Sequence, residues 1–209
     1  MIVLRALGAL LSYPHRELLE ALPEITEALR ASLLISPQDR GALEGLIEFL
    51  AETDLLAAEE HYVEMFDRRR ATSLHLFEHI HGDTRTRGDA MVALKAHYER
   101  AGFSLTANEL PDYLPVVLEY LSCLDLAESQ TTLRDCARIL RTIGEALLQR
   151  GSTYSTVFEA LLAIAGEAGL DRAAAPCRAA EDENLDGEWV EQPAFGPPAA
   201  AQAPQEGRL

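Results

Sequence analysis

Two prolines, Pro111 and Pro115, stand four residues apart in a stretch that is otherwise mostly apolar. A proline inside a helix removes a backbone donor and costs roughly 3 kcal/mol, whereas the first turn tolerates it because that amide is unpaired anyway. Apolar residues then follow at helical spacing: Leu114, Val117, Leu118, Leu121 and Leu124. The pattern therefore predicts a buried helix that begins at this pair of prolines.

The rest of the chain up to about residue 170 also carries apolar residues with a helical period. The further helices that we expect cover residues 2–11, 14–30, 37–50 with Ser36 as N-cap, a helix to 66 capped by Thr53 or Asp54, 74–80, 83–101, 131–150, and a last helix to about 169 capped by Ser152 or Thr153. No run alternates as a strand would, and no Asn-Gly hairpin signal separates such runs. We therefore predict an all-α fold, a single compact helical bundle over residues 1–170.

The composition of the chain is that of an ordinary globular protein: it has 209 residues, of which 48% are hydrophobic and 25% are charged. Such a body needs neither metal nor disulfides to fold. The three cysteines form no Cys-x-x-Cys pair, and Cys123 and Cys136 fall in helical patterns, so we expect buried thiols in a reducing compartment. Ala6–Leu11 is too short for a secretory signal and no run is long enough to span a membrane. A cytoplasmic protein without membrane anchoring is expected.

Acidic residues dominate the charge, which is −16 overall. Between Glu17 and Glu64 there are twelve acids and two bases, a net charge of −10. Such a field repels nucleic acid phosphates and anionic lipid, and it attracts basic peptides. Nucleic acid is therefore not an expected partner.

Residues 171–209 differ in character, because they are rich in Ala, Pro and acid, with eight acids against three bases. We predict a disordered, acidic C-terminal tail whose deletion leaves the bundle folded. One short segment, Trp189–Phe195, holds two aromatic residues in polar surroundings. It is either a segment that docks elsewhere or an incidental pair of aromatic residues.

The segment His75-Leu76-Phe77-Glu78-His79 matches the His-x-x-Glu-His pattern of one class of zinc proteases. The pattern places two imidazoles on one helix face, but a hydrolytic site also needs a third ligand and an orienting carboxylate. The alternative is a surface or groove-lining pair of histidines. A zinc hydrolase therefore stays a weak alternative, and no nucleotide-binding or nucleophile motif is present.

Several short segments share a family resemblance. They are Leu10–Pro14, Tyr62–Asp67, Ser73–Leu74, Gly82–Gly88, Gly102–Leu105, Glu109–Glu119 and Trp189–Pro193. Together they resemble the nitrate reductase molybdenum cofactor assembly chaperones, the NarJ family, which is related to the chaperones that bind twin-arginine leaders. The chain departs from the family at His75, Phe77 and His79, where the family has a Tyr-rich segment.

The resemblance implies an all-helical, non-catalytic protein with no cofactor or metal of its own. It implies a cytoplasmic chaperone that binds the basic N-terminal leader of the apo catalytic (alpha) subunit of respiratory nitrate reductase. That binding would keep the subunit competent for molybdenum cofactor insertion, and proteins of molybdenum cofactor biosynthesis are further implied partners. A chaperone for another molybdoenzyme, such as dimethyl sulfoxide reductase, is the alternative, although Tyr113 in Pro-Asp-Tyr-Leu-Pro favours nitrate reductase.

Polar and aromatic residues around the Pro111 helix form the expected peptide-binding site. Carboxylates would meet leader Arg or Lys groups, and rings and prolines would form a rigid apolar wall. The expected site consists of Tyr62, Asp67, Asp83, Arg87, Glu109, Pro111, Asp112, Tyr113, Pro115 and Glu119. For Asp83 and Asp112 the alternative is a structural role, in which each carboxylate caps the start of its own helix.

Overall fold

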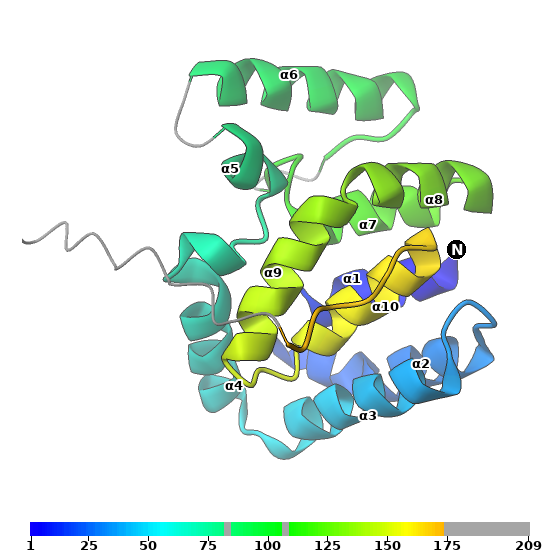
Figure 1. Ribbon diagram of the computed structural model, residues 1–209, viewed down its shortest axis with the longest axis vertical. Coiled ribbons are helices and arrows are strands. Elements are labelled where there is room, and N and C mark those ends of the chain that lie inside the picture. The colour runs from blue at the N-terminus through cyan, green and yellow to red at the C-terminus, as the bar shows by residue number, and fades with distance from the viewer. Residues whose placement is uncertain (82–84, 106–108, 174–209) are drawn as a thin grey trace, which may run out of the picture. The chain divides into compact units, whose positions relative to one another are not determined.

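The computed structural model describes residues 1–81, 85–105 and 109–173, and regular structure in these ranges is helical apart from one isolated β-bridge (Figure 1). The α-helices in these ranges are α1 (Ile2–Leu10), α2 (Arg16–Ala31), α3 (Pro37–Glu52), α4 (Leu55–Tyr62), α5 (Leu76–His81), α6 (Arg85–Arg100), α7 (Leu114–Ser122), α8 (Leu126–Asp135), α9 (Ala137–Gln149) and α10 (Ser155–Ala165). Two short turns, η1 (Val63–Asp67) and η2 (Arg70–Thr72), join α4 to α5. The all-α prediction is confirmed for the described residues.

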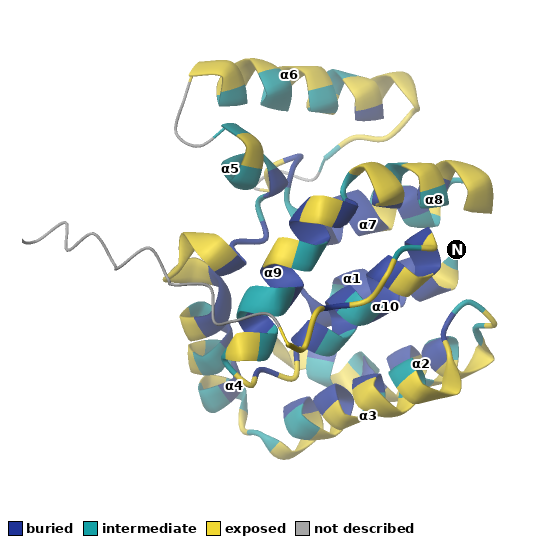
Figure 2. Cartoon of the chain, in the orientation of Figure 1, coloured by how far each residue is buried: buried dark blue, intermediate teal, exposed yellow. Residues whose placement is uncertain are grey.

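Helices α1 and α10 form the centre of the core, and their buried faces are dark blue in Figure 2. Helix α1 packs on α7, and α10 packs on α9, α8 and α3. Helix α9 approaches α10 closely at Gly144, where an added Cβ would lie 2.8 Å from Phe158 Cβ and 2.7 Å from a methyl group of Leu170. Only glycine lets α9 and α10 lie this close.

Several helix boundaries follow the sequence signals. Ser36 accepts a hydrogen bond from the Asp39 N–H at 3.1 Å, and Asp54 accepts one from Ala57 N–H at 3.1 Å. Helix α7 has Pro115 in its first turn, as the proline argument predicts. Helix α10 ends earlier than expected, at Gly166, whose φ of 75° is the left-handed geometry that favours glycine.

The single helix expected over 131–150 is instead two helices, α8 and α9, which meet at Cys136. Helix α8 begins at Leu126 because the Asp125 side chain caps it, accepting from the Glu128 N–H at 2.8 Å. The expectation of two buried thiols is wrong for Cys123, which is exposed at the C-terminal end of α7, while Cys136 is half-buried.

Two features of the backbone were not expected. Pro23 lies inside α2, on its exposed side, and η1 is a turn of π-helix that continues α4. Such π turns insert one residue and often lie near functional sites. No helix in the described residues is both long and apolar enough to cross a membrane.

Helix α6 is unlike the others, because Tyr98 is its one fully buried residue. In Figures 1 and 2 it lies beside α5 and above α7 and α8, with most of its surface exposed. Met91 and Leu94 are only half-buried, although the sequence places them with Tyr98 on one face. A helix held this loosely leaves room beneath it.

Candidate functional site

The segment Pro111–Tyr113 contacts α5 and α6 just before α7 begins. It runs antiparallel to the residues before α5: Leu76 N–H donates to the Asp112 carbonyl at 3.1 Å, and Leu114 N–H donates to the Leu74 carbonyl at 2.9 Å. Tyr98 of α6 donates its hydroxyl proton to the Pro111 carbonyl at 2.9 Å. The Pro111–Tyr113 segment therefore fixes the positions of α5, α6 and α7 relative to one another.

Tyrosine hydroxyls link the same segment to α1 and α4. The Tyr62 hydroxyl donates to the Leu11 carbonyl at 2.8 Å and lies 2.8 Å from the Tyr113 hydroxyl. Burial is the main cause that raises the pKa of Tyr62 and of Tyr98, with Tyr113 and Tyr120 respectively adding to it. Both phenols therefore stay protonated and can keep donating to backbone carbonyls.

Asp112 is 0% exposed, and both of its carboxylate oxygens have partners. One oxygen accepts from the Phe77 N–H at 3.0 Å, and the other lies 3.4 Å from Nδ1 of His75. Tyr113, and not Asp112, is the N-cap residue of α7. Asp112 therefore caps α5, a different helix from the one expected, and its buried carboxylate does not line an open groove as the sequence suggested.

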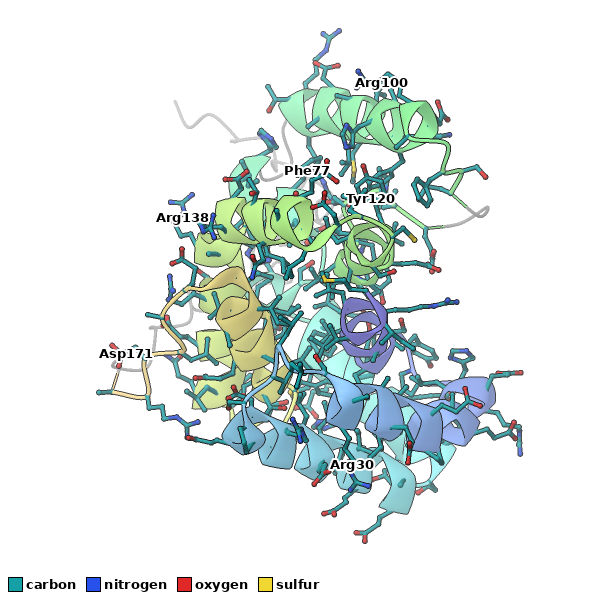
Figure 3. All side chains as sticks on the ribbon, turned by 90° about the vertical axis from the view of Figure 1, so that its right-hand side faces the viewer. Arg30, Phe77, Arg100, Tyr120, Arg138 and Asp171 are labelled. Atoms are coloured by element: carbon teal, nitrogen blue, oxygen red, sulfur yellow. The ribbon has the colours of Figure 1, made fainter. Side chains whose placement is uncertain are left out.

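An apolar groove of about 580 Å³ opens between α6 and the helices α7 and α8. The residues that line it include Leu76 and Phe77 of α5, Leu94, His97 and Tyr98 of α6, Val117, Tyr120 and Leu121 of α7, then Leu124, Glu128, Thr131 and Cys136. Phe77 and Tyr120, both labelled in Figure 3, lie below α6. Among the lining residues Glu128 is the one carboxylate, so the groove is suited to apolar side chains.

Aromatic contacts join α6 to α7 beside this groove. The rings of Tyr98 and Tyr120 are 4.7 Å apart, and Phe103 meets Tyr120 edge-on at 5.3 Å. The Tyr120 hydroxyl lies 3.0 Å from Nε2 of His97. These contacts tie the C-terminal half of α6 to α7, while the ion pair between Arg87 and Glu78, at 3.0 Å, ties its N-terminal half to α5.

A second hollow, of about 450 Å³, lies on the other side of α5 and is polar. Its lining consists of Phe66, Asp67, Arg68, Arg69, Arg70, Ser73, His75 and Glu78. Helix α5 and the residue before it thus separate two environments: Leu76 and Phe77 face the apolar groove, whereas His75 and Glu78 face the polar hollow.

The residues of the expected site do not all come together. Tyr62, Asp112, Tyr113 and Pro111 meet at the junction, Asp67 lies in the polar hollow, and Arg87 bonds Glu78 beside it. Glu109, Pro115 and Glu119 instead line a hollow of about 150 Å³ against α1, and Glu109 and Glu119 also line one of about 230 Å³ beside Phe103. Asp83 lies outside the described residues. Glu109 precedes α7 and Glu119 lies on its exposed side, and neither residue lines the polar hollow.

A groove was expected, but with a lining different from that of the apolar groove. Periodicity placed Leu94 and Tyr98 on one face of a helix, but Tyr120, Thr131 and Cys136 join them only through the packing of α7, α8 and α9. The acidic segment 17–64 forms α2, α3 and α4 and contributes no residue to the groove lining. The acids of that segment can therefore act on a ligand in this groove only at a distance.

The two histidines of the His-x-x-Glu-His segment point to different partners. Nε2–H of His79 donates to the Ser73 carbonyl at 2.9 Å, while Nδ1 of His75 faces Asp112. Within the described ranges no three His, Cys, Asp or Glu side chains are grouped so that they could hold a metal ion. The described geometry gives a zinc-dependent reaction no support.

Comparison with known proteins agrees with the resemblance. The chain is 41% identical over 197 residues to the nitrate reductase molybdenum cofactor assembly chaperone NarJ of Escherichia coli K12, covering 92% of this chain and 84% of that protein. It is 40% identical to the NarW protein of the same organism, over 79% of this chain and 69% of that one. The NarJ protein of Bacillus subtilis is 31% identical, over 78% and 87% of the two chains.

A solved structure of a redox enzyme maturation protein from Archaeoglobus fulgidus has the same fold, with a TM-score of 0.54 over 76% of this chain and 88% of that chain. The identity there is 20%, so this likeness concerns the fold alone. The family model described as "Nitrate reductase delta subunit" matches residues 34–160, which is more than half of the chain and includes every residue that lines the groove. The chain therefore belongs to the nitrate reductase delta subunit family, together with the NarJ assembly chaperones.

Proposed function

We propose that this protein is an assembly chaperone of nitrate reductase, which binds the leader of the apo catalytic subunit in the apolar groove between α6 and α7–α8. The relatives named as nitrate reductase molybdenum cofactor assembly chaperones support nitrate reductase as the protein that this chain assists. The groove, whose apolar and aromatic walls come mainly from α5, α6, α7 and α8, supports the proposed way of binding. In this proposal the protein binds the leader in the cytoplasm and catalyses no reaction.

An amphipathic helix is the form of leader that such a groove fits. Helix-in-groove recognition uses apolar residues that repeat every three or four positions and enter a hydrophobic channel. The leader's apolar face would lie against Phe77, Leu94 and Tyr120. Its basic residues would remain outside the groove, where Glu128 is the acid at the rim.

The acids of α2–α4 act at longer range in this proposal. They contribute no residue to the groove lining, so they favour the approach of a basic leader without contacting it once bound. Higher salt should then slow association while dissociation changes little. Salt-independent association would show that the acidic helices play no part in recognition.

Two variants on one helix test the groove. Leu94 lines the groove and Val92, two residues away, is 71% exposed and does not. Leu94→Gln should weaken binding of the nitrate reductase leader peptide about tenfold, because it removes roughly 1–2 kcal/mol of apolar burial. Val92→Gln should bind like the wild type. Calorimetric titration of both variants measures the difference.

The identity of the client is tested by competition. A leader peptide from dimethyl sulfoxide reductase should displace the nitrate reductase leader only at much higher concentration. Tighter binding of the dimethyl sulfoxide reductase leader would favour the chaperone of another molybdoenzyme, and equal binding would contradict a client-specific chaperone. If the wild-type protein bound neither peptide, or if the two α6 variants bound equally well, the groove would not be the leader site. Contacts with proteins of molybdenum cofactor biosynthesis stay a prediction.

A further inference from the structure

We infer that Asp112 is a positioning residue: its buried carboxylate fixes the start of α5 and thereby holds the Leu76–Phe77 wall of the apolar groove in place. The inference rests on the proposed function in one respect, because its consequence for binding requires that the leader occupies this groove. It assigns Asp112 a role different from the leader contact that the sequence suggests.

Direct contact between Asp112 and a leader conflicts with the geometry. The side chain is 0% exposed, and its two oxygens are already engaged by Phe77 N–H and by His75 Nδ1. A leader arginine could reach it only if α5 moved away from the Pro111–Tyr113 segment. A buried carboxylate that loses its partners is strongly unfavourable, so such a movement is opposed.

Helix α5 needs this support because it is short. It has only six residues, and an isolated helix of that length does not form in water. The first N–H groups of any helix lack acceptors inside the helix. Asp112 lies 35 residues away in the sequence and supplies one of these acceptors, with a negative charge at the end of the helix that favours it.

Two further contacts hold α5 to the same segment. The backbone bridge between His75 and Tyr113 fixes the register of the chain just before α5 begins. The rings of His75 and Tyr113 lie 5.3 Å apart, so the His75 imidazole is held between Asp112 and Tyr113. The start of α5 is thus determined by Asp112 and Tyr113 together.

The position of α5 then sets both sides of the groove. Leu76 and Phe77 form part of its wall directly. On the other face, Glu78 pairs with Arg87 at 3.0 Å, so α5 also anchors the N-terminal half of α6. Leu94, which lines the groove, follows in the next half of the same helix, so its position depends in part on this anchor. A shift at Asp112 would therefore reach the leader site through α5 and α6 without a contact between Asp112 and the leader.

Two substitutions at Asp112 separate positioning from contact. Asp112→Asn keeps an oxygen that can accept from Phe77 N–H, whereas Asp112→Ala removes the acceptor altogether. We expect the Asn variant to bind the nitrate reductase leader within about threefold of the wild type and the Ala variant about tenfold more weakly. The dependence of affinity on salt should be the same in all three proteins, because no leader charge loses its partner.

Hydrogen exchange supplies the readout that does not depend on a leader. Amides of residues 76–81 should exchange at least about tenfold faster in the Ala variant, while amides of α2 and α3 should be unchanged. Asp54→Ala is the matched control, since it removes a carboxylate cap from α4, which does not line the groove. That variant should leave the α5 amides and the affinity for the leader as they are.

Equal loss of affinity in the Asn and Ala variants, with a weaker salt dependence, would establish direct contact and overturn the inference. Unchanged exchange of the α5 amides in the Ala variant would also overturn it. If the Ala variant does not fold, the Asn variant decides alone, by its affinity and its salt dependence. Failure of the wild type to bind the leader would refute the proposed function instead, and the α5 amides would still decide whether Asp112 positions this helix.

Discussion

The region around α10 and the region around α6 use opposite means to hold a helix in place. Helix α10 is buried along almost its whole length, with Val157, Phe158 and Leu161 at zero exposure, and α9 approaches it through Gly144. Helix α6 buries one residue fully, and its surface is mostly exposed or half-buried in Figure 2. Polar contacts near its ends, through Arg87 and Tyr98, attach it. Close packing fills the first region, and a groove remains in the second.

The contrast between these two regions concerns what a tightly packed helix and a loosely packed helix can each contribute. Apolar burial stabilises a fold because it removes surface from water and leaves no void, and such a region has no space for a ligand. A helix fixed by a few directional contacts can instead border an open apolar surface, because hydrogen bonds determine its position. In this protein α10 and the helices around it belong to the core, and the apolar groove lies in the α6 region.

The largest expected effect is at the centre of the packed region. Phe158→Ala should destabilise the protein by about 3–5 kcal/mol, because Phe158 is fully buried against α9 and a cavity would remain. For a chain of this size the melting temperature should fall by about 6–20 °C. Thermal unfolding measures the change, with Val92→Ala on the exposed face of α6 as the control. A shift no larger than that of Val92→Ala would contradict the assignment of the core.

The two regions also differ in how well the sequence predicted them. In the packed region the information is local: Ser36, Asp54 and the apolar period each specify a helix from neighbouring residues, and the structure confirms them. The break between α8 and α9 was missed because the apolar period of residues 131–150 continues across Cys136. Only the Asp125 cap signals that the first of these helices begins earlier.

In the α6 region the decisive contacts are between residues far apart in the sequence. Asp112 looked like the cap of the helix that follows it, since capping rules concern neighbours, yet it caps α5, which precedes it by more than thirty residues. Tyr120 and Thr131 reach the groove only because α7 and α8 pack beside α6. Periodicity within one helix contains no information on these pairings.

A smaller effect is expected where α6 meets the Pro111 segment. Tyr98→Phe keeps the ring packed on Tyr120 but removes the hydroxyl that donates to the Pro111 carbonyl, which should cost about 1 kcal/mol. The loss should appear as faster hydrogen exchange in α6, because its C-terminal half is held by this contact, while α9 and α10 stay protected. Uniform deprotection of all helices would mean that α6 is as much part of the core as α10.

The smallest effect is expected at ion pairs, and two of them permit a direct comparison. Arg30 of α2 pairs with Glu44 of α3 at 2.8 Å, with side chains 58% and 34% exposed, whereas Arg87 of α6 pairs with Glu78 of α5 at 3.0 Å, with side chains 20% and 25% exposed. Exposed pairs contribute roughly 0–1 kcal/mol, since water and salt screen them.

Arg30→Gln should therefore leave the melting temperature within about 2 °C of the wild type, because apolar packing already holds α2 on α3. Arg87→Gln should have the larger effect on α6, because water screens its pair less and little apolar contact supports that end of the helix. Exchange rates of α6 amides, measured at low and high salt in both variants, give the comparison. If Arg30→Gln loosened α2 as much as Arg87→Gln loosened α6, the contrast between a packed region and a polar-held region would be wrong.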